Sequence, residues 1–186
     1  MTGQRADARR NYARILAVAE AEVAAHGADA SLEQIARTAG VGSATVRRHF
    51  PGRRALLAAV FGERIAVLCA RATALTDAPD ARQALLEWLH ALTAYAASAR
   101  GMADALMQDG LTDPEQVQDC STKLRAAAEP LVQRAAQAGA LAPGVTAADL
   151  LTLVTGIALA TEHHQDPTAE AGRLLDLTVR GVVPPR

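Results

Sequence analysis

Hydrophobic residues recur along this chain at the spacing of one helical face, and glycine, proline and capping residues interrupt them. The first apolar stripe runs from Tyr12 to Val23 with i, i+3 and i+4 spacing and ends at His26. Gly27 follows directly, and a glycine just after the last periodic residue is a common helix stop. The pattern predicts a helix over about residues 7–26.

Two short helices on either side of a glycine turn are expected next. Ser31 stands where a helix cap belongs, and Gln34 three residues later completes the pattern of a capping box. Gly40 makes the turn, and Ser43 is expected to cap the following segment until Pro51 ends it. The predicted ranges are about 32–38 and 44–49.

Longer apolar stripes fill the rest of the chain. Thr146 and Asp149 form a second capping-box pattern, and Pro130 inside one stripe predicts a kink or a split. Proline marks three of the starts, at Pro79, Pro114 and Pro167. The predicted ranges are about 53–75, 80–98, 102–108, 114–138, 147–163 and 167–180, which makes about nine helices.

Composition supports a wholly helical fold. The hydrophobic fraction is 50%, and it is carried by 44 alanines and 22 leucines rather than by the two phenylalanines, two tyrosines and one tryptophan. Alanine and leucine favour helices, whereas β-branched and aromatic residues favour strands. A charged fraction of 21% leaves enough apolar residues for a core, which excludes an intrinsically disordered chain. The predicted fold class is all-α.

Charge is unevenly distributed although the net charge is only −1. Residues 1–54 hold nine arginines against five acidic residues, a balance of +4, which leaves −5 for the remainder. A basic segment of this kind is typical of contact with a polyanion such as nucleic acid, although a solvated charged face gives similar numbers.

Cysteine spacing and hydropathy argue against disulfide-rich, zinc-binding, secreted and membrane-spanning proteins. Cys69 and Cys120 have no partner at disulfide-scaffold or zinc-site spacing, so we expect two buried small hydrophobic residues. The longest uncharged apolar stretch, Leu150 to Thr161, is too short to span a bilayer, and no secretory segment is visible at the start. We therefore expect a cytoplasmic protein with no membrane partner.

Residues 31–50, SLEQIARTAGVGSATVRRHF, have the pattern of a helix-turn-helix unit. The apolar positions that can share one small core are Leu32, Ile35, Ala36, Ala39, Val41, Val46 and Phe50. The outward polar positions, which offer donors for base edges and phosphates, are Ser43, Thr45, Arg47, Arg48 and His49. The alternative is an exposed arginine pair on an ordinary bundle helix.

The run from Arg10 to Leu57 resembles the N-terminal domain of the tetracycline-repressor (TetR) family of transcriptional regulators. The matching segments are RILAVAEAEVAAHG, SLEQIARTAGVGSATVRRHF and PGRRALL, in the family's order. The resemblance implies a three-helix DNA-binding domain over residues 1–54 and a larger helical ligand-binding and dimerisation domain over residues 55–186. It also implies repression that a small molecule relieves in a bacterial, nucleoid-associated protein.

The resemblance carries over to individual positions. Thr45 and His49 match common family residues, and Arg53 stands where a lysine is usual and keeps its charge. Arg47 replaces a tyrosine that commonly touches the DNA backbone, so its role is open between a phosphate contact and a guanine contact. The expected DNA-binding residues are Arg10, Ser31, Ser43, Thr45, Arg47, Arg48, His49 and Arg53.

Two further sets of residues are candidates in the C-terminal domain. A ligand cavity is expected to be lined by Leu68, Cys69, Trp88, Tyr95, Met102 and Met107, or else these are plain core. A dimer interface is expected at Leu150, Leu153, Val154, Ile157, Leu174, Leu175 and Thr178, or else these only cover their own domain. Paired antiparallel helices from two subunits then form a four-helix bundle with twofold symmetry.

The sequence favours a sequence-specific, dimeric DNA-binding repressor that a small-molecule effector releases from a pseudo-palindromic operator in double-stranded DNA. The alternative is a helical small-molecule-binding sensor without specific DNA recognition. The sequence contains no glycine-rich phosphate loop, nucleophile elbow or HExxH motif, so we expect no catalytic residues, no cofactor and no metal site.

Overall fold

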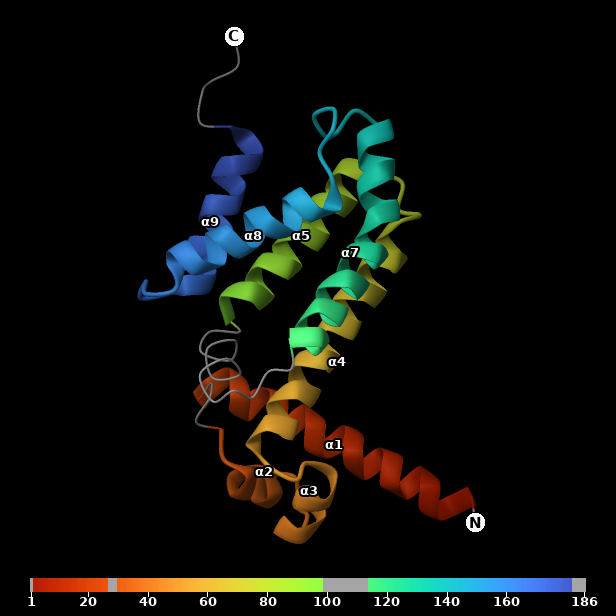
Figure 1. The fold of residues 1–186 in the computed structure, drawn as a ribbon, viewed down its shortest axis with the longest axis vertical. Coiled ribbons are helices and arrows are strands. Elements are labelled where there is room, and N and C mark those ends of the chain that lie inside the picture. The colour runs from red at the N-terminus through yellow and green to blue at the C-terminus, as the bar shows by residue number, and fades with distance from the viewer. Residues whose placement is uncertain (1, 27–29, 99–113, 182–186) are drawn as a thin grey trace. The chain divides into compact units, whose positions relative to one another are not determined.

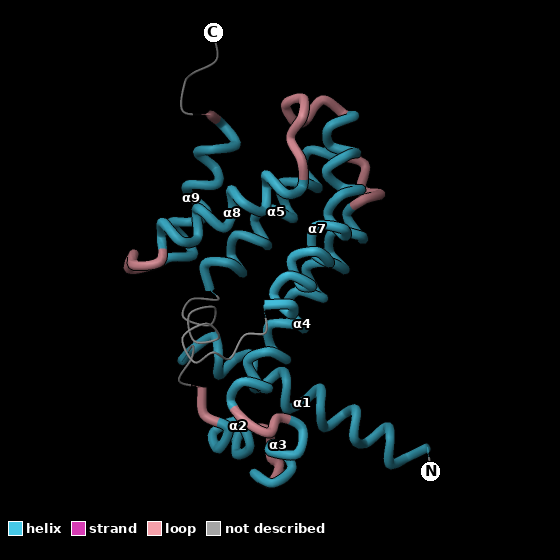
Figure 2. Tube along the Cα trace, viewed as in Figure 1, coloured by secondary structure: helices cyan, strands magenta, loops and turns pink. Residues whose placement is uncertain are grey.

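The structure, a computed structural model, describes residues 2–26, 30–98 and 114–181 (Figure 1). Every regular element in these ranges is a helix and no strand occurs among them (Figure 2), which confirms the all-α prediction. The helix predicted at 102–108 lies outside the described residues. The described helices are α1 (Thr2–His26), α2 (Leu32–Thr38), α3 (Ser43–His49), α4 (Arg53–Leu75), α5 (Ala81–Ser98), α7 (Pro114–Gln137), α8 (Ala147–Thr161) and α9 (Pro167–Arg180).

The chain divides into two compact units within α4, between Glu63 and Arg64. We call them the head, which holds α1, α2, α3 and the first part of α4, and the body, which holds the remaining helices. Helix α4 belongs to both by covalent continuity. In the described ranges, no helix combines the length and apolar character that a membrane span requires.

The core of the head is small and is built from the predicted apolar positions. Ile35 and Ala36 of α2, Val46 of α3, and the residues that follow the two helices, Ala39 and Phe50, are at most 4% exposed. Leu32 and Val41 are half-buried. Helix α2 packs against both α1 and α3, so the predicted shared core is confirmed.

Gly40 makes the turn between α2 and α3 by a backbone conformation that favours glycine. Its φ is +63°, and the N–H groups of Gly40 and Val41 donate to the carbonyls of Arg37 and Ala36 at 3.2 and 3.0 Å. These two bonds are a Schellman motif, which satisfies the last carbonyls of α2 and stops the helix.

The cap of α3 differs from the prediction. Ser43 is the first residue of the helix, and Gly42 takes the cap position in an extended conformation. The Gly42 carbonyl accepts from the N–H groups of Thr45 and Val46, at 2.8 and 3.2 Å, without any side-chain cap. The helix therefore begins one residue before the predicted start, and the prediction that Ser43 caps it is wrong.

Helix α5 is central to the body because it packs against α7, α8 and α9. Its Trp88 is fully buried, and the indole N–H donates to the Leu68 carbonyl of α4 at 3.1 Å. Helix α7 continues through Pro130, so the chain does not split there. Cys69 and Cys120 are half-buried thiols rather than fully buried hydrophobic residues as predicted, and burial raises the pKa of Cys69.

Capping residues begin the last two helices, and the capping box of α8 and the proline start of α9 are as predicted. Thr146 Oγ1 accepts from the Asp149 N–H at 3.2 Å, and Asp149 Oδ2 accepts from the Thr146 N–H at 2.9 Å, which closes the capping box of α8. Asp166 caps α9 by accepting from the Ala169 N–H at 3.0 Å, with Pro167 in the first turn. Both caps satisfy N–H groups that the helix itself leaves unpaired.

The capping box of α8 generates a pH-dependent prediction. Hydrogen bonds from the hydroxyl and backbone of Thr146 hold the pKa of Asp149 below its ordinary value of 3.8. A carboxyl group with a lowered folded pKa stabilises the protein above its unfolded pKa, and the contribution disappears as pH falls through the folded pKa. We expect Asp149→Ala to lower the melting temperature at neutral pH, measured by circular dichroism, and the deficit to shrink in acid.

Asp77→Ala is the matched control, because Asp77 is an exposed carboxylate outside any helix cap. It should leave the melting temperature unchanged at both pH values. A deficit of Asp149→Ala that stayed undiminished well below pH 3.8 would show that the carboxylate is not its source.

Candidate nucleic-acid interface

Helix α3 separates an apolar side from a polar side. Val46 and the following Phe50 are at most 1% exposed and fix the helix to the core of the head. Ser43, Arg47 and Arg48 are exposed, and Thr45 and His49 are half-buried beside them. The structure therefore brings the five predicted α3 residues to the solvent side of one short helix, and we call this set the reading face.

The end of the reading face is braced by a ring from α1. The Tyr12 ring meets the His49 ring edge-on, with centroids 5.7 Å apart, and lies 5.5 Å from the Phe50 ring. Tyr12 is 38% exposed, so the ring is part of the surface as well as of the contact. Sequence reasoning placed Tyr12 on an apolar stripe and missed its contact with the reading face.

An acidic residue from α2 stands beside the reading face. The Arg47 Nη2 atom lies 3.8 Å from Glu33 Oε1, and both side chains are mostly exposed. Sequence reasoning missed this ion pair because the two residues belong to different helices. Among the described residues, Arg48 has no ion-pair partner, and its side chain is exposed.

The other predicted DNA-binding residues lie on three helices of the head. Arg10 is exposed on α1 and pairs with Asp7. Ser31 is exposed at the cap of α2, where its hydroxyl accepts from the Gln34 N–H at 3.3 Å. Arg53 is half-buried at the first position of α4.

The capping box predicted for α2 is only half formed. Gln34 does not reach back to the Ser31 N–H; its side-chain amide donates to Thr38 Oγ1, and its carbonyl oxygen accepts from Arg37. Glu22 of α1 takes its place and accepts from the Ser31 N–H at 3.4 Å. A carboxylate from a neighbouring helix thus replaces the local partner, which sequence spacing does not reveal.

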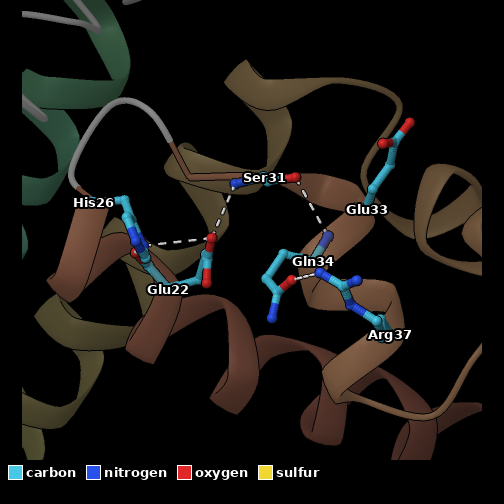
Figure 3. A pocket seen from close by; sticks show the side chains of 6 residues that line it. All are labelled: Glu22, His26, Ser31, Glu33, Gln34 and Arg37. Atoms are coloured by element: carbon cyan, nitrogen blue, oxygen red, sulfur yellow. Dashed lines mark hydrogen bonds and ion pairs between the residues drawn. The ribbon is translucent and has the colours of Figure 1, made fainter.

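Glu22 also lies in an open pocket of about 620 Å³ at the junction of α1 and α2 (Figure 3). Its Oε1 lies 3.4 Å from the Nδ1 of His26, and the Glu22 side chain is only 15% exposed. Glu33 points away from the group formed by Glu22, His26 and Ser31 (Figure 3). The remaining lining residues are Gln34 and Arg37.

The predicted cavity residues of the body are not gathered around the described pocket. Leu68 and Trp88 are buried and hydrogen-bonded to each other, and Cys69 is half-buried on the same helix as Leu68. Tyr95 is half-buried under the Arg64 guanidinium, 5.7 Å from its ring centroid, and burial raises the pKa of its hydroxyl. Met102 and Met107 lie outside the described residues.

The predicted interface residues fall on both sides of α8 and α9. Leu150, Val154, Ile157 and Leu175 are buried within the body, Leu174 is half-buried, and Leu153 and Thr178 are exposed. Leu159, which the prediction omitted, is 66% exposed. The first turn of α8 exposes the charged Asp149; beyond that turn, the exposed arc of α8 has no charged residue and consists of Thr152, Leu153, Thr155, Gly156, Leu159 and Ala160.

Family models match most of the chain. One described as bacterial regulatory proteins of the tetR family matches residues 15–60, and one described as the SbtR-like transcriptional regulator C-terminal domain matches residues 80–184. The second covers more than half of the 186 residues. No curated protein matches the sequence.

Solved structures share the fold over nearly the whole chain. A TetR transcriptional regulator from Streptomyces coelicolor is 36% identical, with a TM-score of 0.75 over 93% of this chain and 98% of its own. A TetR regulatory protein from Mycobacterium vanbaalenii is 34% identical, with a TM-score of 0.71 over 86% and 96%. A regulator from Saccharomonospora viridis in complex with choline is 18% identical, with a TM-score of 0.67 over 97% and 100%.

The hydrogen bond between Glu22 and the Ser31 N–H leads to a prediction about the stability of the protein. Glu22→Ala removes the acceptor for the Ser31 N–H, so we expect it to lower the free energy of unfolding by about 1–2 kcal/mol, the usual cost of a lost helix cap. Glu22→Gln keeps an acceptor oxygen and should lose much less. Urea unfolding followed by circular dichroism measures both.

Glu20→Ala, on the same helix, is the matched control and should change stability less than Glu22→Ala. Hydrogen exchange adds a local readout, because the Ser31 amide should exchange faster in Glu22→Ala only. Unchanged Ser31 protection would contradict the assigned cap.

Proposed function

From the membership of this chain in the TetR family of transcriptional regulators, we propose that it is a dimeric repressor that a small-molecule effector releases from a pseudo-palindromic operator. The observation that carries the proposal is the reading face. A short helix buries Val46 and Phe50 and exposes Arg47 and Arg48 on its other side. This is the arrangement by which a recognition helix enters the major groove.

The polar residues of the head fall into two groups, those suited to contact bases and those suited to contact phosphates. Ser43 and Thr45 offer short hydroxyl groups to base edges near the start of the reading helix. Arg48, Arg53 and Arg10 offer charge to the phosphates, which position the protein and make affinity depend on salt. Arg47 has the reach and the paired donors for a guanine edge.

Dimerisation is proposed through the exposed arc of α8 together with α9. The arc has no charge, and the hydroxyls of Thr152 and Thr155 donate to backbone carbonyls of their own helix, at 2.9 and 2.8 Å. The surface it offers to a partner is therefore effectively apolar, and a second copy buries it. Twofold symmetry then places two reading helices on successive turns of the major groove.

The effector is proposed to act through the body. Structures with the same fold have been solved with choline and with stearoyl-CoA bound. A ligand that binds better to the conformation unable to bind DNA shifts the population toward it by that difference in affinity. Helix α4, which runs through both units, is the proposed connection.

Selection of bound duplexes from a random pool tests the function. One enriched palindrome supports the repressor, and no enrichment supports the alternative, a small-molecule-binding sensor without specific DNA recognition. The enriched duplex then serves in the binding experiments that follow.

Substitutions in the head should separate affinity from specificity. We expect Arg48→Ala and Arg53→Ala to weaken binding to every sequence and to lower the slope of log affinity against log salt by about one each. Thr45→Ala and Arg47→Ala should change base preference instead. Gel-shift titrations at several salt concentrations measure both properties.

Arg82→Ala, an exposed arginine of the body, is the control for these titrations and should bind as the wild type does. If all four head variants kept the affinity and the base preference of the wild type, the assignment of these residues to DNA binding would be wrong.

The interface is tested by placing a charge on the exposed arc of α8. Leu159→Glu should give a monomer by light scattering and weaken operator binding, because a carboxylate buried between two subunits loses its hydration. Val67→Glu is the matched control, since Val67 is another exposed hydrophobic residue, 57% exposed on α4. A Leu159→Glu protein that stayed dimeric would place the interface elsewhere.

A further inference from the structure

One arginine of the reading face has an acidic partner from another helix, and the next arginine has none. Glu33 lies in the first turn of α2 and Arg47 in the last turn of α3, and the two helices pack against each other. The 3.8 Å approach of Glu33 Oε1 to Arg47 Nη2 therefore crosses the helix-turn-helix unit. Arg48, one residue further on, is exposed and without such a partner in the described part of the chain.

Stability does not account for this pair. The two side chains are 63% and 77% exposed, and exposed ion pairs contribute about 0–1 kcal/mol. Glu33 also stands apart from the cap of α2, because its carboxylate points away from Glu22 and Ser31 (Figure 3). Its place in the first turn of α2 favours a carboxylate whether or not Arg47 is near, and a carboxylate beside the reading face also repels phosphates and weakens general affinity for DNA.

The chemistry of the Glu33–Arg47 pair suggests how a carboxylate at this position could help Arg47 to recognise a base. A guanidinium is planar and has five N–H donors, and at 3.8 Å the Glu33 carboxylate attracts the Arg47 guanidinium without a hydrogen bond, so its donors stay available to a base. Guanine is recognised by two parallel hydrogen bonds to O6 and N7, which requires a fixed guanidinium plane. An arginine that already has a carboxylate neighbour loses less side-chain freedom on binding and is attracted less strongly to phosphates.

We propose that Glu33 is a positioning residue for base recognition: it holds Arg47 toward a guanine edge and away from the phosphates, while the unpaired Arg48 binds the backbone. The proposal rests on the proposed function, since it requires a specific operator. It goes beyond that function in two ways. Glu33 of α2 becomes a residue that affects base specificity, and Arg47 is assigned a contact with a base.

A double-mutant cycle tests it with the full-length protein. Wild type, Glu33→Gln, Arg47→Ala and the double variant are titrated with the selected operator, with operators carrying single base-pair changes, and with an unrelated duplex. Glu33→Gln should raise affinity for the unrelated duplex and reduce discrimination at one G·C pair by roughly fivefold or more. In the Arg47→Ala background it should cause no further loss of discrimination.

Salt dependence provides a second, independent readout. In the wild type, Arg47→Ala should leave the salt slope nearly unchanged, because Arg47 does not contact a phosphate. In the Glu33→Gln background the released Arg47 reaches the backbone, so its removal should lower the slope by about one.

Glu63→Gln is the matched control, since it also removes one exposed carboxylate from the head but lies on α4. It should raise affinity for all duplexes without changing discrimination. Melting temperatures of all variants should match that of the wild type, because every changed side chain is exposed. This keeps loss of folding separate from loss of specificity.

Four results overturn the proposal. Discrimination that is unchanged in Glu33→Gln, or equally reduced with and without Arg47, removes the positioning role while leaving the repressor function intact. Effects equal to those of Glu63→Gln show that Glu33 acts only as a negative charge. A wild type that selects no sequence overturns the proposed function and this role together.

Discussion

Helices of seven residues are too short to persist in water by themselves, so α2 and α3 depend on the few apolar side chains that they bury together. Ile35, Ala36, Val46 and Phe50 are almost completely excluded from solvent. Ala36 contributes a small buried side chain to this core, and its backbone carbonyl is the acceptor that ends α2 at the Gly40 turn. With this small core closed, Ser43, Arg47 and Arg48 of α3 face solvent, and Thr45 and His49 remain half-exposed beside them.

The surroundings of the reading face are acidic as well as basic. Glu33 stands beside Arg47, Asp7 beside Arg10, and Glu22 under the cap of α2. Residues 1–54, which have a net balance of +4, thus place three of their carboxylates close to particular cationic or N–H groups. Such an arrangement favours selectivity over general affinity, because each paired arginine gives up part of its attraction to the backbone.

Local signals predicted local structure well. The capping box of Thr146 and Asp149 was recognisable because both partners lie within one helical turn, and the apolar spacing identified the helices and the shared core of the head. The cap of α3 was misplaced because a serine is the usual cap, whereas here the backbone of Gly42 serves. The partners supplied by Glu22, Glu33 and Tyr12 come from neighbouring helices, and no spacing rule within one helix announces them.

The cap of α2 has a consequence for how such regulators can be recombined. Because the Ser31 N–H donates to Glu22 of α1 and not to its own helix, the helix-turn-helix segment lacks one of the partners that the start of α2 uses in this protein. A chimeric regulator that borrowed residues 31–50 alone would leave behind both this carboxylate and the Tyr12 ring that braces His49. The smallest transferable module of this protein therefore begins with its first helix.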